Sequence, residues 1–164
     1  MDDRSEPDSA KARRILTDRI EAGRRARNGA DLGDALAQLS QIERREGNRD
    51  AAIALYQEAA DVARSEGAPL RLAHRLRHIG DIYRESGDAE RAALHYGEAL
   101  ALYRADPEPP ALDLANLLRP LALLSEARDE PDAAQPYWTE ARALYERAGV
   151  AAGVDECTRH LDAR

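Results

Sequence analysis

Apolar and small residues recur at steps of three and four along three stretches of the chain, which is the spacing of one face of an α-helix. The middle stretch has two such stripes, formed by Leu72, Leu76, Ile79 and Tyr83 and then by Ala92, Tyr96 and Ala99. Between them lie Gly87, which suits a left-handed helix C-cap, and Asp88, which suits an N-cap. The pattern therefore predicts an antiparallel helical hairpin over 69–105.

Two further stretches align with the middle one and predict hairpins over about 31–67 and 110–149. The spacing between equivalent residues is 40 from Ala59 to Ala99 and 42 from Ala99 to Ala141. The other aligned positions are Leu36, Leu39, Ser40, Gly47, Ala52 and Tyr56 in the first stretch and Leu118, Leu121, Ala122, Asp129, Ala134 and Trp138 in the third. Such a period is typical of stacked hairpins that share one core.

The segments outside the hairpins predict one more helix at each end. Leu16 and Ile20 lie four residues apart near the N-terminus, and Val154, Cys157 and Leu161 are spaced to pack inward near the C-terminus. Because an end hairpin exposes apolar surface, we expect these helices to cap it. The expected organisation is a disordered tail over 1–8 and a single domain over 9–164, with capping helices at 9–28 and 151–162.

Two prolines fall inside the predicted helices of the third hairpin, Pro120 in the first helix and Pro136 in the second. A proline in a helix interior removes a hydrogen bond and kinks the helix, at a cost of about 3 kcal/mol. We therefore expect the third hairpin to be the least regular.

The middle stretch resembles the tetratricopeptide repeat at nearly every signature position, from Leu76, Gly80 and Tyr83 to Ala92 and Tyr96. The long period and the run 134–138 are similar to the longer repeats of kinesin light chains. The resemblance implies an all-α fold: an α-solenoid of three antiparallel hairpins between N- and C-terminal capping helices, wound into a right-handed superhelix. It also implies a non-catalytic adaptor or scaffold that binds a protein or peptide in a concave groove.

In tetratricopeptide superhelices the first helix of each hairpin lines the groove, and the residues concerned fall between those of the apolar stripe. That register places in the groove Gln38, Gln41 and Arg45, then His74, Arg77, His78, Asp81 and Arg84, and then Asn116, Arg119 and Leu123. Four of them are arginines, which bind carboxylates in bidentate pairs, so a partner with acidic groups is expected. The alternative is that these arginines are ordinary solvated charges.

The charge balance narrows the class of partner. A formal net charge of −7 argues against binding of DNA or RNA, which usually requires a basic face. The chain has no apolar stretch of membrane-spanning length, and its N-terminus does not resemble a signal peptide. Its one cysteine, Cys157, cannot form an intramolecular disulfide. We therefore expect a cytoplasmic protein that binds neither nucleic acid nor membrane.

Two other functions stay open. His74 and His78 lie four residues apart on one helix face, with Asp81 a turn further on, so they could bind a divalent metal in a metal-binding protein or enzyme. They could also make recognition pH-dependent, because histidine titrates near neutrality. A self-assembly module is the second alternative, although we expect a monomer or weak homo-oligomer. No phosphate-binding loop or nucleophile elbow occurs and Cys157 holds a core position, so no catalytic residue and no cofactor is predicted.

Overall fold

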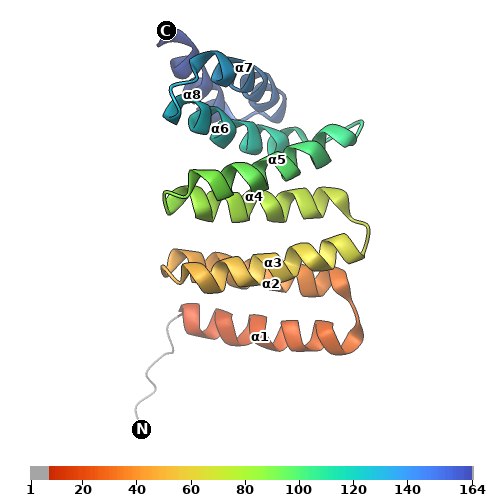
Figure 1. The fold of residues 1–164 in the computed structure, drawn as a ribbon. Helices are drawn as coiled ribbons and strands as arrows, with labels where there is room; N and C mark the ends of the chain where they lie inside the picture. The colour runs from red at the N-terminus through yellow and green to blue at the C-terminus, as the bar shows by residue number, and fades with distance from the viewer. Residues whose placement is uncertain (1–7, 164) are drawn as a thin grey trace. The chain divides into compact units, whose positions relative to one another are not determined.

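The computed structural model describes residues 8–163, and within them the chain is all-α with eight helices (Figure 1). The helices are α1 Asp8–Ala26, α2 Gly29–Arg45, α3 Arg49–Ser65, α4 Pro69–Glu85, α5 Ala89–Ala105, α6 Ala111–Ala127, α7 Pro131–Ala148 and α8 Ala151–Asp162. None of these described helices is long and apolar enough to cross a membrane. The tail expected over 1–8 lies outside the described residues except for Asp8, which begins α1.

Helices α2 and α3 pack together, as do α6 and α7, and α4 and α5 follow one another in the expected order, so the predicted fold class is confirmed. α4 begins 40 residues after α2, and α6 begins 42 residues after α4. The two extra residues lie in one loop, because residues 66–68 join α3 to α4 whereas residues 106–110 join α5 to α6. The longer loop contains three prolines, and its backbone leaves α5 in an extended conformation at Asp106.

The turns inside the hairpins close with the same pair of backbone hydrogen bonds. Gly87 has a φ of 81°. Its N–H donates to the carbonyl of Arg84, and the N–H of Asp88 donates to the carbonyl of Tyr83. This is the Schellman arrangement that ends many helices. The third hairpin makes the same two bonds around Asp129, whose φ is 60°. Aspartate tolerates the left-handed region better than most residues, so the turn forms there without glycine.

The first helix ends two residues earlier than the predicted range of 9–28. Arg27 has a left-handed φ of 52°, so the helix cannot continue past Ala26. Asn28 then starts the next helix, because its side chain accepts a hydrogen bond from the Asp31 N–H at 3.3 Å. Asparagine is a strong N-cap, which explains why α2 begins directly after Asn28.

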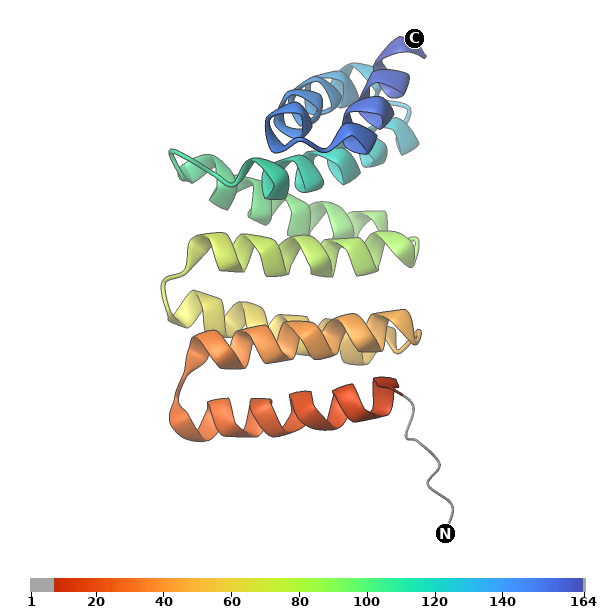
Figure 2. The same cartoon turned by 180° about the vertical axis from the view of Figure 1, so that it is seen from behind.

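The chain groups into two compact units, of which the first runs up to Ile82 and the second begins at Tyr83. In the first unit α1 lies beside α2 in both views (Figures 1 and 2). Leu16 and Ile20 of α1 join a buried cluster with Ala35, Leu36 and Ala59. The predicted single domain over 9–164 is not tested by this grouping and stays a prediction.

Small residues allow α2 and α3 to pack closely. Ser40 is fully buried, and its hydroxyl donates a hydrogen bond to the carbonyl of Ala52 at 2.6 Å. Ala52 and Ala60 are likewise fully buried on α3. The small residues that recur through the repeat therefore lie where one helix of the hairpin meets the other.

The second unit has its core between α6 and α7, where Trp138, Leu117 and Leu118 are fully buried. Pro120 and Pro136 both lie inside helices that continue without a break, so the expected irregularity of the third hairpin does not interrupt either helix. α8 packs on α7. A Cβ atom at Gly153 would lie 2.6 Å from the Tyr145 ring, so this glycine is what lets the two helices approach so closely.

Candidate functional site

In the first unit, polar and aromatic side chains of α2, α3 and α4 meet on one surface. Gln41 Nε2 donates a hydrogen bond to Tyr56 Oη at 2.5 Å. The His78 ring stacks on the Tyr56 ring, with centroids 5.1 Å apart and planes 13° from parallel. The His74 ring meets His78 edge-on at 4.7 Å. We call this group, together with Arg77 and Asp81, the histidine cluster.

Arg77 closes the histidine cluster through a triangle of polar contacts. Its Nη1 donates to Asp81 Oδ2 at 3.0 Å, and its Nη2 donates to His78 Nε2 at 2.8 Å. His78 Nδ1 lies 3.3 Å from the same aspartate oxygen. Because Nε2 accepts from an arginine, the imidazole is neutral and carries its proton on Nδ1, which faces the carboxylate. The triangle fixes the tautomer and the ring orientation that stacks on Tyr56.

Burial keeps both histidines of this cluster uncharged. The pKa of His74 is lowered to about 3, most of all by burial and then by the neighbouring His78, Arg77 and Arg75, against the opposing effect of Asp81. The pKa of His78 is also lowered, because the effect of burial outweighs the opposing effect of the Asp81 carboxylate. A recognition switch near neutral pH, which the sequence suggested, is therefore not supported, because neither ring gains a proton there.

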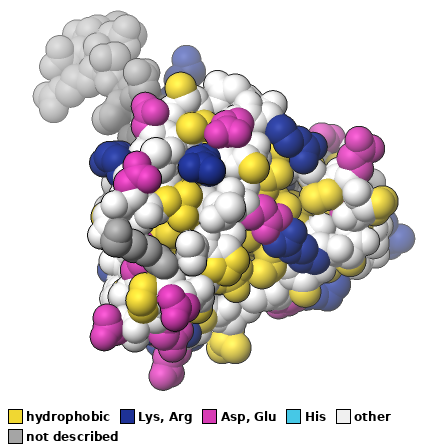
Figure 3. Space-filling model, turned by 90° about the horizontal axis from the view of Figure 1, so that it is seen from above, with side chains coloured by type: hydrophobic (Ala, Val, Ile, Leu, Met, Phe, Trp, Pro, Cys, Tyr) yellow, Lys and Arg dark blue, Asp and Glu magenta, His cyan; other side chains and the backbone are white. Residues whose placement is uncertain are grey.

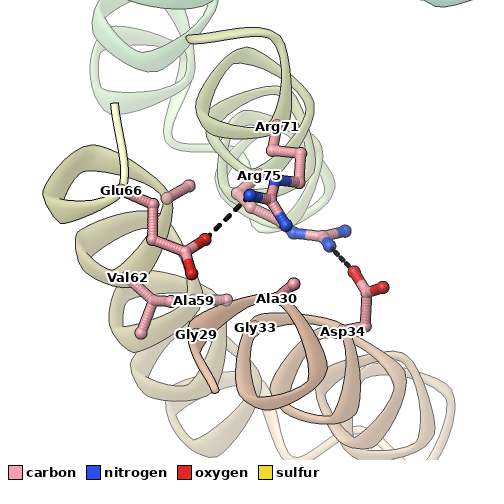
Figure 4. A pocket seen from close by; sticks show the side chains of 10 residues that line it. Gly29, Ala30, Gly33, Asp34, Ala59, Val62, Glu66, Arg71 and Arg75 are labelled. Carbon is pink, nitrogen blue, oxygen red and sulfur yellow. Dashed lines mark hydrogen bonds and ion pairs between the residues drawn. The ribbon is translucent and has the colours of Figure 1, made fainter. Parts of the chain in front are cut away.

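Two ion pairs join α4 to the α2–α3 hairpin beside the histidine cluster. Arg75 Nη2 lies 2.5 Å from Asp34 Oδ1, and Arg71 Nη2 lies 2.8 Å from Glu66 Oε2, as Figure 4 shows. They border a cavity of about 10 Å³, whose other lining residues are mostly small, such as Gly33. That volume is about the space that one water molecule needs. This space is structural and is too small for an organic ligand.

In the second unit the predicted groove residues contact other parts of the chain. Arg119 binds Glu156 of α8 in a bidentate pair, with both N–O distances 2.7 Å. Asn116 Oδ1 accepts a hydrogen bond from Tyr145 Oη at 2.9 Å. The charge of Arg119 is therefore partly neutralised by a carboxylate of its own chain. The hydrogen bond from Arg119 in turn lowers the pKa of Glu156.

A second aromatic–histidine stack joins α7 and α8. The His160 ring lies 4.1 Å from the Trp138 ring with planes 17° apart. Glu126 accepts a hydrogen bond from Trp138 Nε1 at 2.8 Å and lies 3.1 Å from His160 Nδ1. Trp138 holds in the third hairpin the place of Tyr56 in the first, so the arrangement repeats the stack of His78 on Tyr56. Trp138 was identified from the sequence only as an aligned repeat position, and the repeat alignment was the signal that could have paired it with His160.

The structure brings together five of the predicted groove residues, all of them in the first unit. Gln41, His74, Arg77, His78 and Asp81 belong to the histidine cluster. The remaining predicted positions lie outside it, namely Gln38, Arg45, Arg84, Asn116, Arg119 and Leu123. On the face in Figure 3, basic and acidic side chains lie beside one another with hydrophobic side chains between them.

The metal-site alternative is not supported by this geometry. Asp81 is engaged by Arg77, and His78 Nε2, one of the two ring nitrogens that could bind a metal, accepts from the same arginine. Among the described residues, no group of three or more histidines, cysteines and acids is arranged to hold a metal ion. Cys157 is fully buried, and burial raises the pKa of its thiol to about 11, so it is a poor nucleophile.

Comparison with protein families matches residues 31–105 to the tetratricopeptide repeat. Among solved structures, the chain is similar to the crystal structure of BtubC (BKLC) from P. vanneervenii, with a TM-score of 0.73 and 20% identity over 96% of this chain and 74% of that one. The crystal structure of the MamA protein aligns with a TM-score of 0.35 and 12% identity, over 85% of this chain and 95% of that one. None of the curated proteins matches the chain.

Repeated antiparallel hairpins with small residues where their helices meet define the class of α-helical repeat proteins. Within that class, the family match makes the two hairpins over 31–105 tetratricopeptide repeats, and the family prediction is confirmed. The likeness to BtubC extends the same fold, and the fold alone, over nearly the whole chain.

Proposed function

We propose that this chain is a non-catalytic adaptor that holds a protein or peptide on the face of α2 and α4 in the first unit. Tetratricopeptide repeats generally bind proteins or peptides and are generally not catalytic. The observation that carries the proposal is the histidine cluster, which presents neutral imidazole rings and a fixed amide on a partly exposed surface inside the matched repeats. In this proposal the adaptor is cytoplasmic and uses no cofactor.

The proposed partner carries acidic groups, and the pairing of the arginines within the chain supports a choice among them. Arg77 is held by Asp81 and Arg119 by Glu156, so a partner carboxylate must compete with an internal one at either position. Arg45 is exposed at the end of α2, on the helix that carries Gln38 and Gln41. We therefore infer that Arg45 makes the first contact, with the histidine cluster beside it providing polar and ring surface.

A pair of charge variants with identical chemistry tests the proposal. The surface variant is Gln38→Glu/Arg45→Glu on α2, where both side chains are exposed. The control is Gln57→Glu/Arg64→Glu on α3, which makes the same two changes at exposed positions of the neighbouring helix. Circular dichroism should show the same helicity for both variants and the wild type.

The three proteins are then used to capture partners from a cell lysate, followed by quantitative mass spectrometry. We expect the surface variant to lose specific partners by about tenfold, because a repelling carboxylate replaces the cation. The control should keep them. Identical partner sets for all three proteins would remove this face from the proposed function.

A further inference from the structure

The outward face of α5, in the second unit, differs from those of the other second helices. Leu94 is 72% exposed, more than any other exposed large hydrophobic residue of the described chain. Ala54 holds the corresponding place in α3, and neither α3 nor α7 has a large hydrophobic residue there. Gln57 and Thr139 occupy the place that Gly97 takes in α5. Pro136 holds the place of Leu94 in α7, so of the three second helices α5 alone carries a long aliphatic side chain at this position, beside a glycine where the other two have polar residues.

The surface beside Leu94 is hollowed. Ala93, Leu94 and Gly97 line the hollow together with Arg128 from the turn that follows α6. A Cβ atom added at Gly97 would meet no described atom within 4 Å, so packing within the described chain does not require a glycine. Glycine is disfavoured inside a helix relative to alanine. The open position leaves room for another backbone to approach α5 closely.

The charges around the hollow select the occupant. Glu90 and Glu98 lie one turn before and one turn after Leu94, on the same side of α5, and both are exposed and line the hollow. A second copy docked symmetrically about Leu94 would place carboxylate against carboxylate, whether the helices run antiparallel or parallel. A partner with basic residues one turn on either side of an apolar residue would instead pair with both acids.

We propose that the outward face of α5 binds an amphipathic helix of another protein, which inserts an apolar side chain beside Leu94 and places Lys or Arg against Glu90 and Glu98. Arg128, on the edge of the hollow, meets an acidic residue of that helix. This surface shares no residue with the histidine cluster and requires a basic partner, whereas the proposed α2–α4 face requires an acidic one. The adaptor would then hold two proteins of opposite charge.

The test uses two synthetic helical peptides of about 16 residues, long enough for roughly four turns. Both carry the same leucine stripe, flanked by lysines in one peptide and by glutamates in the other. Fluorescence anisotropy measures their binding to the full chain, and NMR chemical-shift changes locate the bound peptide. We expect only the lysine peptide to bind, with shifts confined to α5 and the turn after α6.

Two variants with the same kind of substitution decide whether binding is specific. Leu94→Gln should weaken binding of the lysine peptide by about tenfold. Ile15→Gln removes another exposed aliphatic side chain, 48% exposed on α1, and should leave binding unchanged. Equal binding of both peptides, equal loss in both variants, or shifts centred on another helix would overturn the proposal.

The alternative occupant has its own readout. Sedimentation velocity of the wild type and Leu94→Gln at high concentration reports whether the face joins two copies of the chain. We expect a monomer in both cases, because symmetric pairing opposes like charges. A wild-type dimer that Leu94→Gln dissolves would overturn the proposal in favour of self-association.

Discussion

Two turns of this protein place a residue other than glycine in the left-handed backbone region, Arg27 with φ 52° and Asp129 with φ 60°. Aspartate is tolerated there because its short polar side chain can bond locally, whereas arginine has no such compensation. Equivalent turns at Gly47 and Gly87 use glycine. The conformational free energy that the left-handed residue costs therefore differs between turns that share the same geometry.

Replacing Arg27 by glycine should stabilise the protein. The expected gain is about 0.5–1 kcal/mol, because glycine adopts positive φ without a Cβ clash. Asp129→Gly should gain less, and Gly87→Ala should lose about 1 kcal/mol or more at a φ of 81°. Urea denaturation followed by circular dichroism measures all three variants. A loss of stability in Arg27→Gly would show that its side chain contributes more than its backbone costs.

The lowered pKa of His74, about 3, links stability to pH. The unfolded histidine titrates near 6.5, so below that pH the unfolded chain binds a proton that the folded chain does not. Neutral His74 therefore does not reduce the free energy of unfolding above about pH 6.5, and the folded chain loses stability as the pH falls below that value. From pH 7 to pH 5 the loss should be about 1–2 kcal/mol.

His74→Gln isolates this effect from general acid denaturation. Its free energy of unfolding should fall less steeply than that of the wild type between pH 7 and pH 5, as measured by urea denaturation. The exposed substitution Gln38→His serves as a control, because an exposed histidine keeps an ordinary pKa and should not steepen the slope. Parallel slopes for wild type and His74→Gln would show that His74 is protonated in the fold.

Among the elements, α8 depends on one close contact. A Cβ atom at Gly153 would lie 2.6 Å from the Tyr145 ring, so Gly153→Ala should push α8 away from α7 and cost about 1–3 kcal/mol. Gly97→Ala is the matched control, because its Cβ meets nothing within 4 Å; it should stabilise α5 by up to about 1 kcal/mol. Thermal unfolding followed by circular dichroism shows whether each variant is more or less stable than the wild type. A neutral Gly153→Ala would mean that the ring moves freely.

The helices and hairpins could be predicted because they depend on local patterns. The stripe from Leu72 to Tyr83 and the cap at Gly87 require only near neighbours in sequence. The stack of His78 on Tyr56 depends on how α4 lies on α3, which no local pattern encodes. Arg119 was predicted to bind a carboxylate of a partner, but the carboxylate that it binds in the structure belongs to Glu156, 37 residues away in the sequence. The pairing inside the histidine cluster therefore could not be predicted from the sequence, and the assignment of the predicted residues to a binding groove stays a prediction.

For the whole molecule, contacts in each unit arise mainly between helices adjacent in sequence. Repeat proteins of this kind owe their stability to each repeat and its neighbours, so a shortened array can still fold. The first unit has its own buried cluster around Leu36 and Ala59. The unit boundary falls inside α4, after Ile82, so a fragment must extend beyond it to keep that helix whole.

A fragment of residues 1–88, which contains all of α4 and its C-terminal turn, should remain helical. We expect circular dichroism to show helicity per residue close to that of the full chain, with a lower unfolding midpoint because an end repeat loses its neighbour. The mirror fragment, 89–164, tests α5 to α8 in the same way. A random-coil spectrum for fragment 1–88 at low temperature would show that the first unit cannot fold by itself.

The loop 106–110, which accounts for the two extra residues of the third repeat, also marks where the chain tolerates a change of length. The turns inside the hairpins are fixed by paired backbone bonds, so one added residue would rotate the following helix out of register. The proline-rich connection has no such pair, and most of its residues are exposed. A protease cleavage sequence or a fluorescent tag could therefore be inserted there without disturbing either adjoining hairpin.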